Sequence, residues 1–192
     1  MSELGVVIVI LHENKVLLTQ REDFEMWCLP GGAVDSNESL ATAALREVSE
    51  ETGLQIQLTH QVGLMSKPFW GRDGTHHIIF AAHPISLTLK ANPQEVKAAA
   101  FFPINQLPEP LLWEHRYFIA AALSGTVGQV WVNRAKTPPY FANRAELYAW
   151  RDNSGLSREA AFQQINKEIG QQTIEVVLGS EQGQCISEAE PF

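Results

Sequence analysis

A glycine turn followed by an acidic helix constrains this chain more than any other stretch. Residues 29–54 read LPGGAVDSNESLATAALREVSEETGL. Asp35 followed three residues later by Glu38 predicts an N-cap with a capping-box partner, and Gly53 stands where a left-handed residue would end the helix. Between these two signals we expect a helix of about four turns.

Three glutamates of this helix, Glu47, Glu50 and Glu51, share one arc of its surface. That arc adjoins a predicted apolar face, which consists of Leu40, Ala41, Ala44, Leu45 and Val48. Like charges three or four residues apart oppose a helix by about 0.2–0.5 kcal/mol per pair, and the single guanidinium of Arg46 cannot neutralise three carboxylates. A hard divalent cation with oxygen ligands can, which indicates Mg²⁺ or Mn²⁺.

A solvated acidic helix face would explain the same glutamates, but the spacing of the whole segment argues against it. The fixed positions are Gly32, Glu38, Arg46-Glu47-Val48, Glu50-Glu51 and Gly53-Leu54. They match every position of the Nudix box, G-x5-E-x7-R-E-U-x-E-E-x-G-U, in which U is a bulky aliphatic residue. The chain therefore resembles the Nudix hydrolases, and the resemblance extends over about residues 4–125.

The resemblance implies an α/β fold, a Nudix-type α/β/α sandwich with a mixed sheet, and the alternating strand and helix signals are compatible with it. We expect a Nudix domain over residues 1–135, where its sheet should end, and a C-terminal α/β extension of unknown role over residues 136–192. Strands are predicted at 4–11, 15–19, 54–58, 61–65, 76–82, 85–90, 96–102, 126–132 and 173–178, and further helices at 110–124, 143–150 and 156–169.

The resemblance also implies an activity, the hydrolysis of a pyrophosphate bond in a nucleoside diphosphate linked to another moiety, such as ADP-ribose or a nucleotide sugar. Charge neutralisation, positioning and water activation should dominate such catalysis. We expect Glu47, Glu51 and the carbonyl of Gly31 to bind Mg²⁺ or Mn²⁺. Glu50 is either a further ligand or the base that activates water, and Arg46 orients it.

A second candidate base follows in the segment EVKAAAFF, which begins at Glu95. Many Nudix hydrolases have the pattern E-V-x-E here, and this chain keeps its first acid but has Ala98 at the second. That departure argues against a base at this position, so Glu50 is preferred and Glu95 is retained as a candidate.

Four residues are candidates for substrate binding. Arg21 precedes the glycine turn, where Nudix proteins often present a basic or aromatic group to the substrate. Phe69 and Trp70 lie in the predicted loop 66–75 and could stack on a base, and His77 lies on the strand that follows. The alternatives are a surface arginine, aromatic rings packed on the protein and a histidine with a structural hydrogen bond.

Charge and composition restrict the partners. Lysine and arginine number 14 against 22 aspartate and glutamate, and the resulting net charge of −8 disfavours nonspecific binding to nucleic acid or an anionic membrane. The apolar run 6–11 is too short for a signal sequence or a membrane span, so we expect a cytoplasmic protein. Cys28 and Cys185 support neither a zinc site nor a disulfide framework.

The expected partner is a small-molecule nucleoside diphosphate derivative, and a homodimer is compatible with the family. The extension carries aromatic side chains that need burial on the core or on a second subunit. The alternative function is a noncatalytic Nudix-like nucleotide sensor that acts through the extension. The unbroken acidic box argues against a sensor, because a binding protein could lose carboxylates that oppose the helix.

Overall fold

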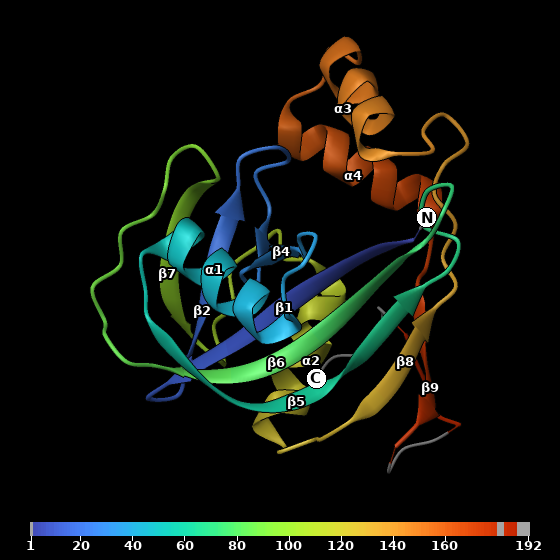
Figure 1. Ribbon diagram of the computed structural model, residues 1–192. Helices are drawn as coiled ribbons and strands as arrows, with labels where there is room; N and C mark the ends of the chain where they lie inside the picture. The colour runs from blue at the N-terminus through green and yellow to red at the C-terminus, as the bar shows by residue number, and fades with distance from the viewer. Residues whose placement is uncertain (1, 180–182, 188–192) are drawn as a thin grey trace.

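A mixed β-sheet runs through the computed structural model, which describes residues 2–179 and 183–187 (Figure 1). Its strands are β1 Glu3–His12, β2 Lys15–Arg21, β3 Trp27–Cys28, β4 Gly31–Ala33, β5 Ile56–Lys67, β6 Thr75–Pro84, β7 Val96–Pro103, β8 Gln129–Asn133, β9 Thr173–Leu178 and β10 Cys185–Ser187. Their order is β10-β9-β8-β5-β6-β1-β2-β3, with β4 paired to β1 and β7 paired to β2. The β1–β6 and β5–β8 pairs are parallel, which makes the sheet mixed.

Two helices cover opposite faces of this sheet, α1 (Leu40–Thr52) and α2 (Trp113–Leu123) (Figure 1). The alternation of β1 shows the division, because Val6 and Ile8 belong to the hydrophobic cluster under α1, whereas Val7 and Val9 belong to the cluster under α2. The predicted α/β/α sandwich is therefore confirmed.

Helix α1 begins later than the sequence predicted. Ser39 is the N-cap, and its hydroxyl accepts a hydrogen bond from the backbone N–H of Thr42 at 3.0 Å. Asp35 cannot be the N-cap because Asn37 adopts a left-handed φ of 65°, which interrupts any helix before Ser39. Asp35 and Glu38 instead form a turn, in which the N–H of Asp35 donates to the Glu38 carboxylate.

Two strand predictions are also wrong. The two segments predicted at 54–58 and 61–65 are replaced by one strand, β5, which begins at Ile56 and whose pairing with β6 shifts register twice. Residues 85–90 alternate like a strand but form none, because the N–H groups of Ile85 and Lys90 bond to Gln55 and Thr52 beside the end of α1. Ile85 and Leu87 face water and are 66% and 55% exposed, whereas Leu89 packs against the hydrophobic cluster under α1.

The C-terminal extension contributes both helices and strands. Helices α3 (Arg144–Asn153) and α4 (Arg158–Ile169) stand at one end of the molecule near the N-terminus (Figure 1). Strand β9 pairs with β8, so the sheet continues past residue 136, where it was expected to end. None of the helices in the described residues combines the length and apolar character needed to cross a membrane.

Gly63 provides a test of how closely β5 and β8 approach each other in the sheet. An added Cβ would lie 2.3 Å from the carbonyl oxygen of Gln129 and 2.4 Å from the Trp131 ring, which is fully buried. We expect Gly63→Ala to lower the free energy of unfolding by about 1–3 kcal/mol, measured by urea denaturation. Val127→Ala, at a site that is 69% exposed, should change it by less than about 0.5 kcal/mol. Equal stabilities for the two variants would contradict the close approach.

Candidate active site

Two carboxylates of α1 face the protein rather than water. The buried residues of this helix are Ala43, Ala44, Val48 and Thr52. At 100° per residue, Glu47 and Glu51 project into the middle of that buried arc, and the Glu47 side chain is only 13% exposed. The predicted apolar face was displaced from this arc, since Ala41 and Leu45 are exposed. The acids therefore lie within the buried face and not beside it.

The glycine turn makes room for these carboxylates. Gly31 has a φ of 149°, and an added Cβ would lie 2.1 Å from the carbonyl oxygen of Val6. An added Cβ at Gly32 would lie 2.4 Å from Oε2 of Glu47. The N–H of Gly31 donates to Oε2 of Glu51 at 3.4 Å. A side chain at Gly31 would collide with the backbone of β1, and one at Gly32 would displace the carboxylate of Glu47 from its place beside the turn.

The electrostatics of the two acids favour a cation beside them. Burial raises the pKa of Glu51 to about 8, and the negative charge of Glu47 adds to this shift. Burial also raises the pKa of Glu47, although Arg46 opposes it. Within residues 2–179 and 183–187, no three His, Cys, Asp or Glu side chains converge into a ready-made ion site. Backbone oxygen, as at Gly31, and water would have to complete the ligand set.

Arg46 connects the acids to the start of the box. Its guanidinium donates two hydrogen bonds of 2.9 Å to Glu38, one of 2.8 Å to Glu47 and one of 3.0 Å to Glu50. The predicted contact with Glu50 is therefore present. Both oxygens of the Glu38 carboxylate accept from Arg46, so the role of Glu38 in this structure is to hold that guanidinium. Glu50 is the most solvent-accessible of these acids, with 45% of its side chain exposed.

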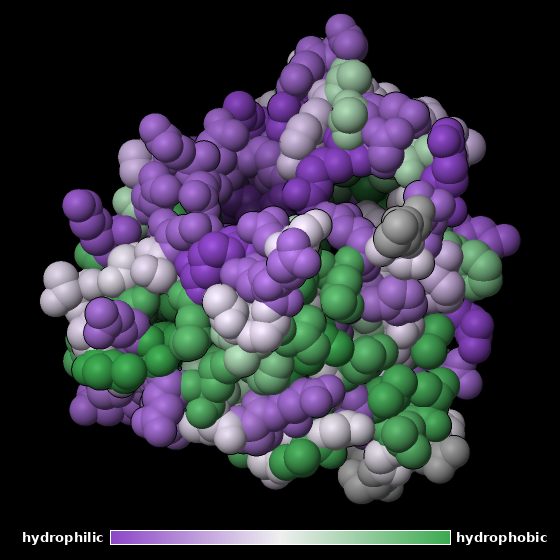
Figure 2. Space-filling view, in the orientation of Figure 1, coloured by the Kyte–Doolittle hydropathy of each residue, from purple (hydrophilic) through white to green (hydrophobic). Residues whose placement is uncertain are grey.

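A cavity of about 400 Å³ opens beside the acids, and Glu51 is the box glutamate that lines it. The surface is hollowed between the extension helices and the body, and its rim is hydrophilic (Figure 2). Predicted residues that line the cavity are Arg21, Gly31, Trp70 and His77. Glu95 lies outside it on the surface, yet near enough for its charge to raise the pKa of Glu51.

Of the two aromatic residues predicted to bind substrate, Trp70 lines the cavity and Phe69 does not. Trp70 lines the cavity with the Lys67 ammonium 4.6 Å from its ring centroid. Phe69 is 45% exposed, lies outside the cavity lining and has Lys136 over its ring.

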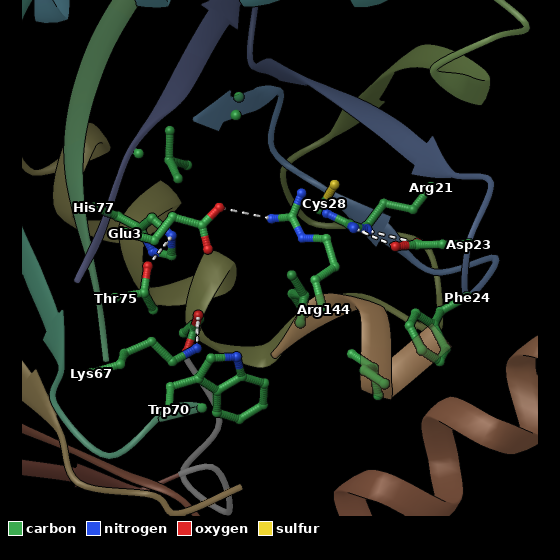
Figure 3. Close-up of a pocket in the computed structure, with 18 of the residues that line it drawn as sticks. Glu3, Arg21, Asp23, Phe24, Cys28, Lys67, Trp70, Thr75, His77 and Arg144 are labelled. Carbon is green, nitrogen blue, oxygen red and sulfur yellow. Dashed lines mark hydrogen bonds and ion pairs between the residues drawn. The ribbon is translucent and has the colours of Figure 1, made fainter. Parts of the chain in front are cut away.

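Figure 3 shows His77 on the opposite side of the cavity from Arg21. Burial lowers the pKa of His77 to about 4, so this imidazole is neutral at pH 7.

Comparison with known proteins agrees with the spacing of the acidic segment and with the fold. A family model described as NUDIX domain matches residues 1–122. The chain belongs to the Nudix family. The match ends within α2, so the extension helices and β8 to β10 lie beyond it.

Among Nudix relatives, a Bacillus subtilis protein named putative 8-oxo-dGTP diphosphatase is 42% identical over 65 residues, which cover 33% of this chain and 44% of that protein. A Methanocaldococcus jannaschii ADP-ribose pyrophosphatase is 36% identical over 117 residues, covering 58% of this chain and 67% of its own length. The NUDIX domain of Shewanella oneidensis NrtR, crystallised with ADP ribose, superposes with a TM-score of 0.55 and 25% identity, covering 65% of this chain and 88% of that domain.

A buried polar network at the cavity was not predicted. Lys67 Nζ lies 2.7 Å from Oε1 of Glu114, and both side chains are less than 10% exposed. Asn133 donates to Glu114 and to Gln172, so the network joins the Nudix region to the extension. One signal was available in the sequence, because Glu114 lies in the first turn of a helix whose other members are mostly apolar, and a charge buried there requires a partner.

His115 fixes the glycine turn from α2 and was also missed. Its Nδ1 accepts a hydrogen bond of 2.8 Å from the backbone N–H of Leu29, two residues before Gly31. Burial lowers the pKa of His115 to about 3, which keeps Nδ1 available as an acceptor near neutral pH. The helix thus holds the turn that receives the two acids.

This histidine predicts a dependence of stability on pH. The pKa of His115 falls from an ordinary 6.5 to about 3 in the folded chain, so the unfolded chain binds more protons between these values. The free energy of unfolding should therefore decrease as the pH falls from about 6.5 toward 3.

We expect His115→Phe to lower the free energy of unfolding at pH 7 by about 1–3 kcal/mol, because the buried Leu29 N–H loses its acceptor. The variant should also lose less stability than the parent between pH 7 and pH 5, measured by urea denaturation at both values. Identical losses in the two proteins would contradict a neutral, buried His115.

Proposed function

We propose that this Nudix protein hydrolyses a pyrophosphate bond in a nucleoside diphosphate linked to another moiety, with Mg²⁺ or Mn²⁺ as cofactor. One observation carries the proposal, the burial of Glu47 and Glu51 against the Gly31–Gly32 turn at the edge of the cavity. Two neighbouring buried carboxylates are costly for a fold unless they serve a cation or a proton transfer. A divalent cation agrees with the general use of such ions in the Nudix family.

The residues present fit such a cation. All candidate donors are oxygens, the carboxylates of Glu47, Glu51 and Glu50 and the carbonyl of Gly31, which suits Mg²⁺ and Mn²⁺. Burial, with the charge of Glu47 added to it, raises the pKa of Glu51 to about 8, and a bound cation would favour the carboxylate form of this acid. When bound, the metal supplies positive charge opposite the phosphoryl oxygens of the substrate.

Glu50 is the proposed general base. Its carboxylate is half exposed and held by Arg46, so it can meet a water molecule from the solvent side while its orientation stays fixed. Glu95 is the alternative base. It is exposed and accepts a 3.2 Å hydrogen bond from Asn92, and its pattern lacks the second acid at Ala98.

We assign the substrate to the cavity, where Arg21, Trp70 and His77 provide a cation, an aromatic face and a neutral hydrogen-bonding ring. A volume of about 400 Å³ lies within the range of small-molecule sites, about 300–1,000 Å³. Phe69 would contact only a substrate that extends beyond the cavity. The names of the M. jannaschii relative and the S. oneidensis complex support ADP-ribose as the first substrate to test.

A noncatalytic nucleotide sensor is the second candidate. It is favoured by the extension helices, which line the cavity with Arg144 and Tyr148 and could report that a ligand is bound. The complete set of acids favours catalysis instead, because a sensor has no need for Glu50 held by Arg46. A homodimer and a cytoplasmic location stay predictions from the sequence.

Metal dependence is the first test of the proposed function. Purified protein is incubated with ADP-ribose, nucleotide sugars, dinucleoside polyphosphates, NAD(H) and nucleoside triphosphates, and the phosphate-containing products are quantified. Hydrolysis of any of these substrates should disappear with EDTA and return with Mg²⁺ or Mn²⁺. Hydrolysis that is indifferent to chelation would rule out the mechanism.

The second test separates the acids. Glu51→Gln and Glu50→Gln should each reduce the rate at least about 100-fold. Glu51→Gln should not lower the free energy of unfolding, because burial already disfavours the ionised form of this acid and a neutral amide avoids that cost. Glu159→Gln, on the exposed surface of α4, is the matched control and should keep the parental rate.

Glu95→Gln should reduce the rate less than Glu50→Gln does. An inactive Glu95→Gln beside an active Glu50→Gln would reverse the assignment of the base.

A further inference from the structure

The extension binds the loop of residues 22–26, which follows β2 at the edge of the cavity. Arg151 donates a 3.0 Å hydrogen bond to the carbonyl of Asp23, and Arg158 contacts both the carbonyl and the carboxylate of Glu22. Phe24 belongs to a hydrophobic cluster with Phe141 and with residues of α4. The position of this loop is therefore set by residues more than a hundred positions later in the chain.

Three hydrogen-bonded polar side chains, one of them in this loop, connect the extension to the cavity. The hydroxyl of Tyr148 on α3 donates to Oδ2 of Asp23 at 2.9 Å. Asp23 in turn accepts two hydrogen bonds from Arg21, one from Nε to Oδ1 at 2.8 Å and a second from Nη2 to Oδ2. Both oxygens of this carboxylate are thus engaged, and Asp23 as a residue is 9% exposed.

These contacts keep Asp23 ionised and fix the plane of the Arg21 guanidinium. Burial disfavours the carboxylate of Asp23, but the hydrogen bonds from Arg21 and Tyr148 outweigh it and hold its pKa below its usual range. A guanidinium held along one edge by a carboxylate has a fixed plane. Tyr148 thus donates to the same carboxylate that holds the guanidinium of Arg21.

The N–H groups of Arg21 that are not donated to Asp23 are left for a ligand in the cavity. A guanidinium has five N–H groups, and Asp23 is the acceptor of its side-chain hydrogen bonds among the residues the structure describes. Arg21 lines the same cavity as Glu51, and its charge lowers the pKa of that acid. Figure 3 shows Arg21 and Asp23 paired at one side of the cavity, with Cys28 beside the guanidinium.

We propose that Tyr148 of the extension is a positioning residue of the active site, which acts through Asp23 to aim Arg21 at an anionic phosphoryl group of the substrate. A fixed guanidinium can donate two parallel hydrogen bonds to a phosphoryl group, whereas a mobile one loses entropy on binding. The inference rests on the proposed function for the identity of the substrate. Tyr148 lies outside the residues that match the Nudix family model, so this device belongs to the extension of this chain.

The alternative is that Tyr148 is only an apolar anchor. Its ring lies 6.3 Å from that of Phe24 and 4.8 Å from the Arg151 guanidinium. Phenylalanine would keep the ring contacts and lose only the hydroxyl. Tyr148→Phe therefore separates positioning of Arg21 from packing.

The experiment uses the full chain and whichever substrate it turns over in the presence of Mg²⁺. We expect Tyr148→Phe to raise KM about three- to tenfold, as the loss of one hydrogen bond in a charged network predicts, with kcat within about twofold of the parent. Tyr140→Phe is the matched control, since Tyr140 stacks on Trp150 in the same cluster and lies outside the cavity lining. It should leave KM unchanged.

A double-mutant cycle tests whether the hydroxyl acts through Arg21. In the background of Arg21→Ala, Tyr148→Phe should have no further effect on KM, because the group that it positions is absent. If Tyr148→Phe raises KM by the same factor with and without Arg21, the hydroxyl acts elsewhere and the proposal is overturned. An unchanged KM in the single variant overturns it as well.

A second readout distinguishes failure of this proposal from failure of the proposed function. The Nε–H of Arg21 should give a protected resonance in ¹⁵N-edited NMR spectra, and Tyr148→Phe should increase its exchange rate with water while Tyr140→Phe does not. If no substrate is hydrolysed in a chelator-sensitive way, the proposed function fails, and titration of ADP-ribose by calorimetry replaces KM. Weaker binding in Tyr148→Phe alone then supports the positioning role, and equal binding by both variants refutes it.

Discussion

The site depends on the close packing of acidic side chains of α1 against a turn made of two glycines. Helix α1 projects Glu47 and Glu51 into its buried arc, and this is sterically possible because Gly31 and Gly32 have no side chains. The same turn lies so close to β1 that a Cβ at Gly31 would overlap the carbonyl of Val6. Close packing on both sides of two glycines therefore places carboxylates where a core would otherwise hold apolar groups.

Polar groups of α1 and α2 stabilise that arrangement. Arg46 offsets part of the charge and is itself held by Glu38, while His115 on the opposite face of the sheet holds the backbone of Leu29. Each partner is polar, buried or half-buried, and engaged in at least one hydrogen bond. This agrees with the rule that buried polar groups persist where all their partners are present.

Local spacing explains why part of the site could be predicted from the sequence. The contact between Arg46 and Glu50 follows from an i,i+4 relation, and the α/β/α sandwich follows from strand alternation and the family resemblance. Asp23 and Tyr148 are 125 positions apart, and Lys67 and Glu114 are 47 apart. Such pairs form only through tertiary packing, which no local pattern encodes. The start of α1 was missed for a local reason, the left-handed Asn37.

The pairing of β9 with β8 has a consequence for the order in which the chain can fold during synthesis. Until residues 173–178 leave the ribosome, the β8 edge has only its β5 partner, and its other backbone groups lack the hydrogen bonds that β9 supplies. An exposed strand edge beside the large apolar ring of Trp131 is a site for intermolecular pairing. The nascent chain thus carries a completed Nudix box before β9 covers the β8 edge, and that edge stays open to intermolecular pairing until residues 173–178 have emerged.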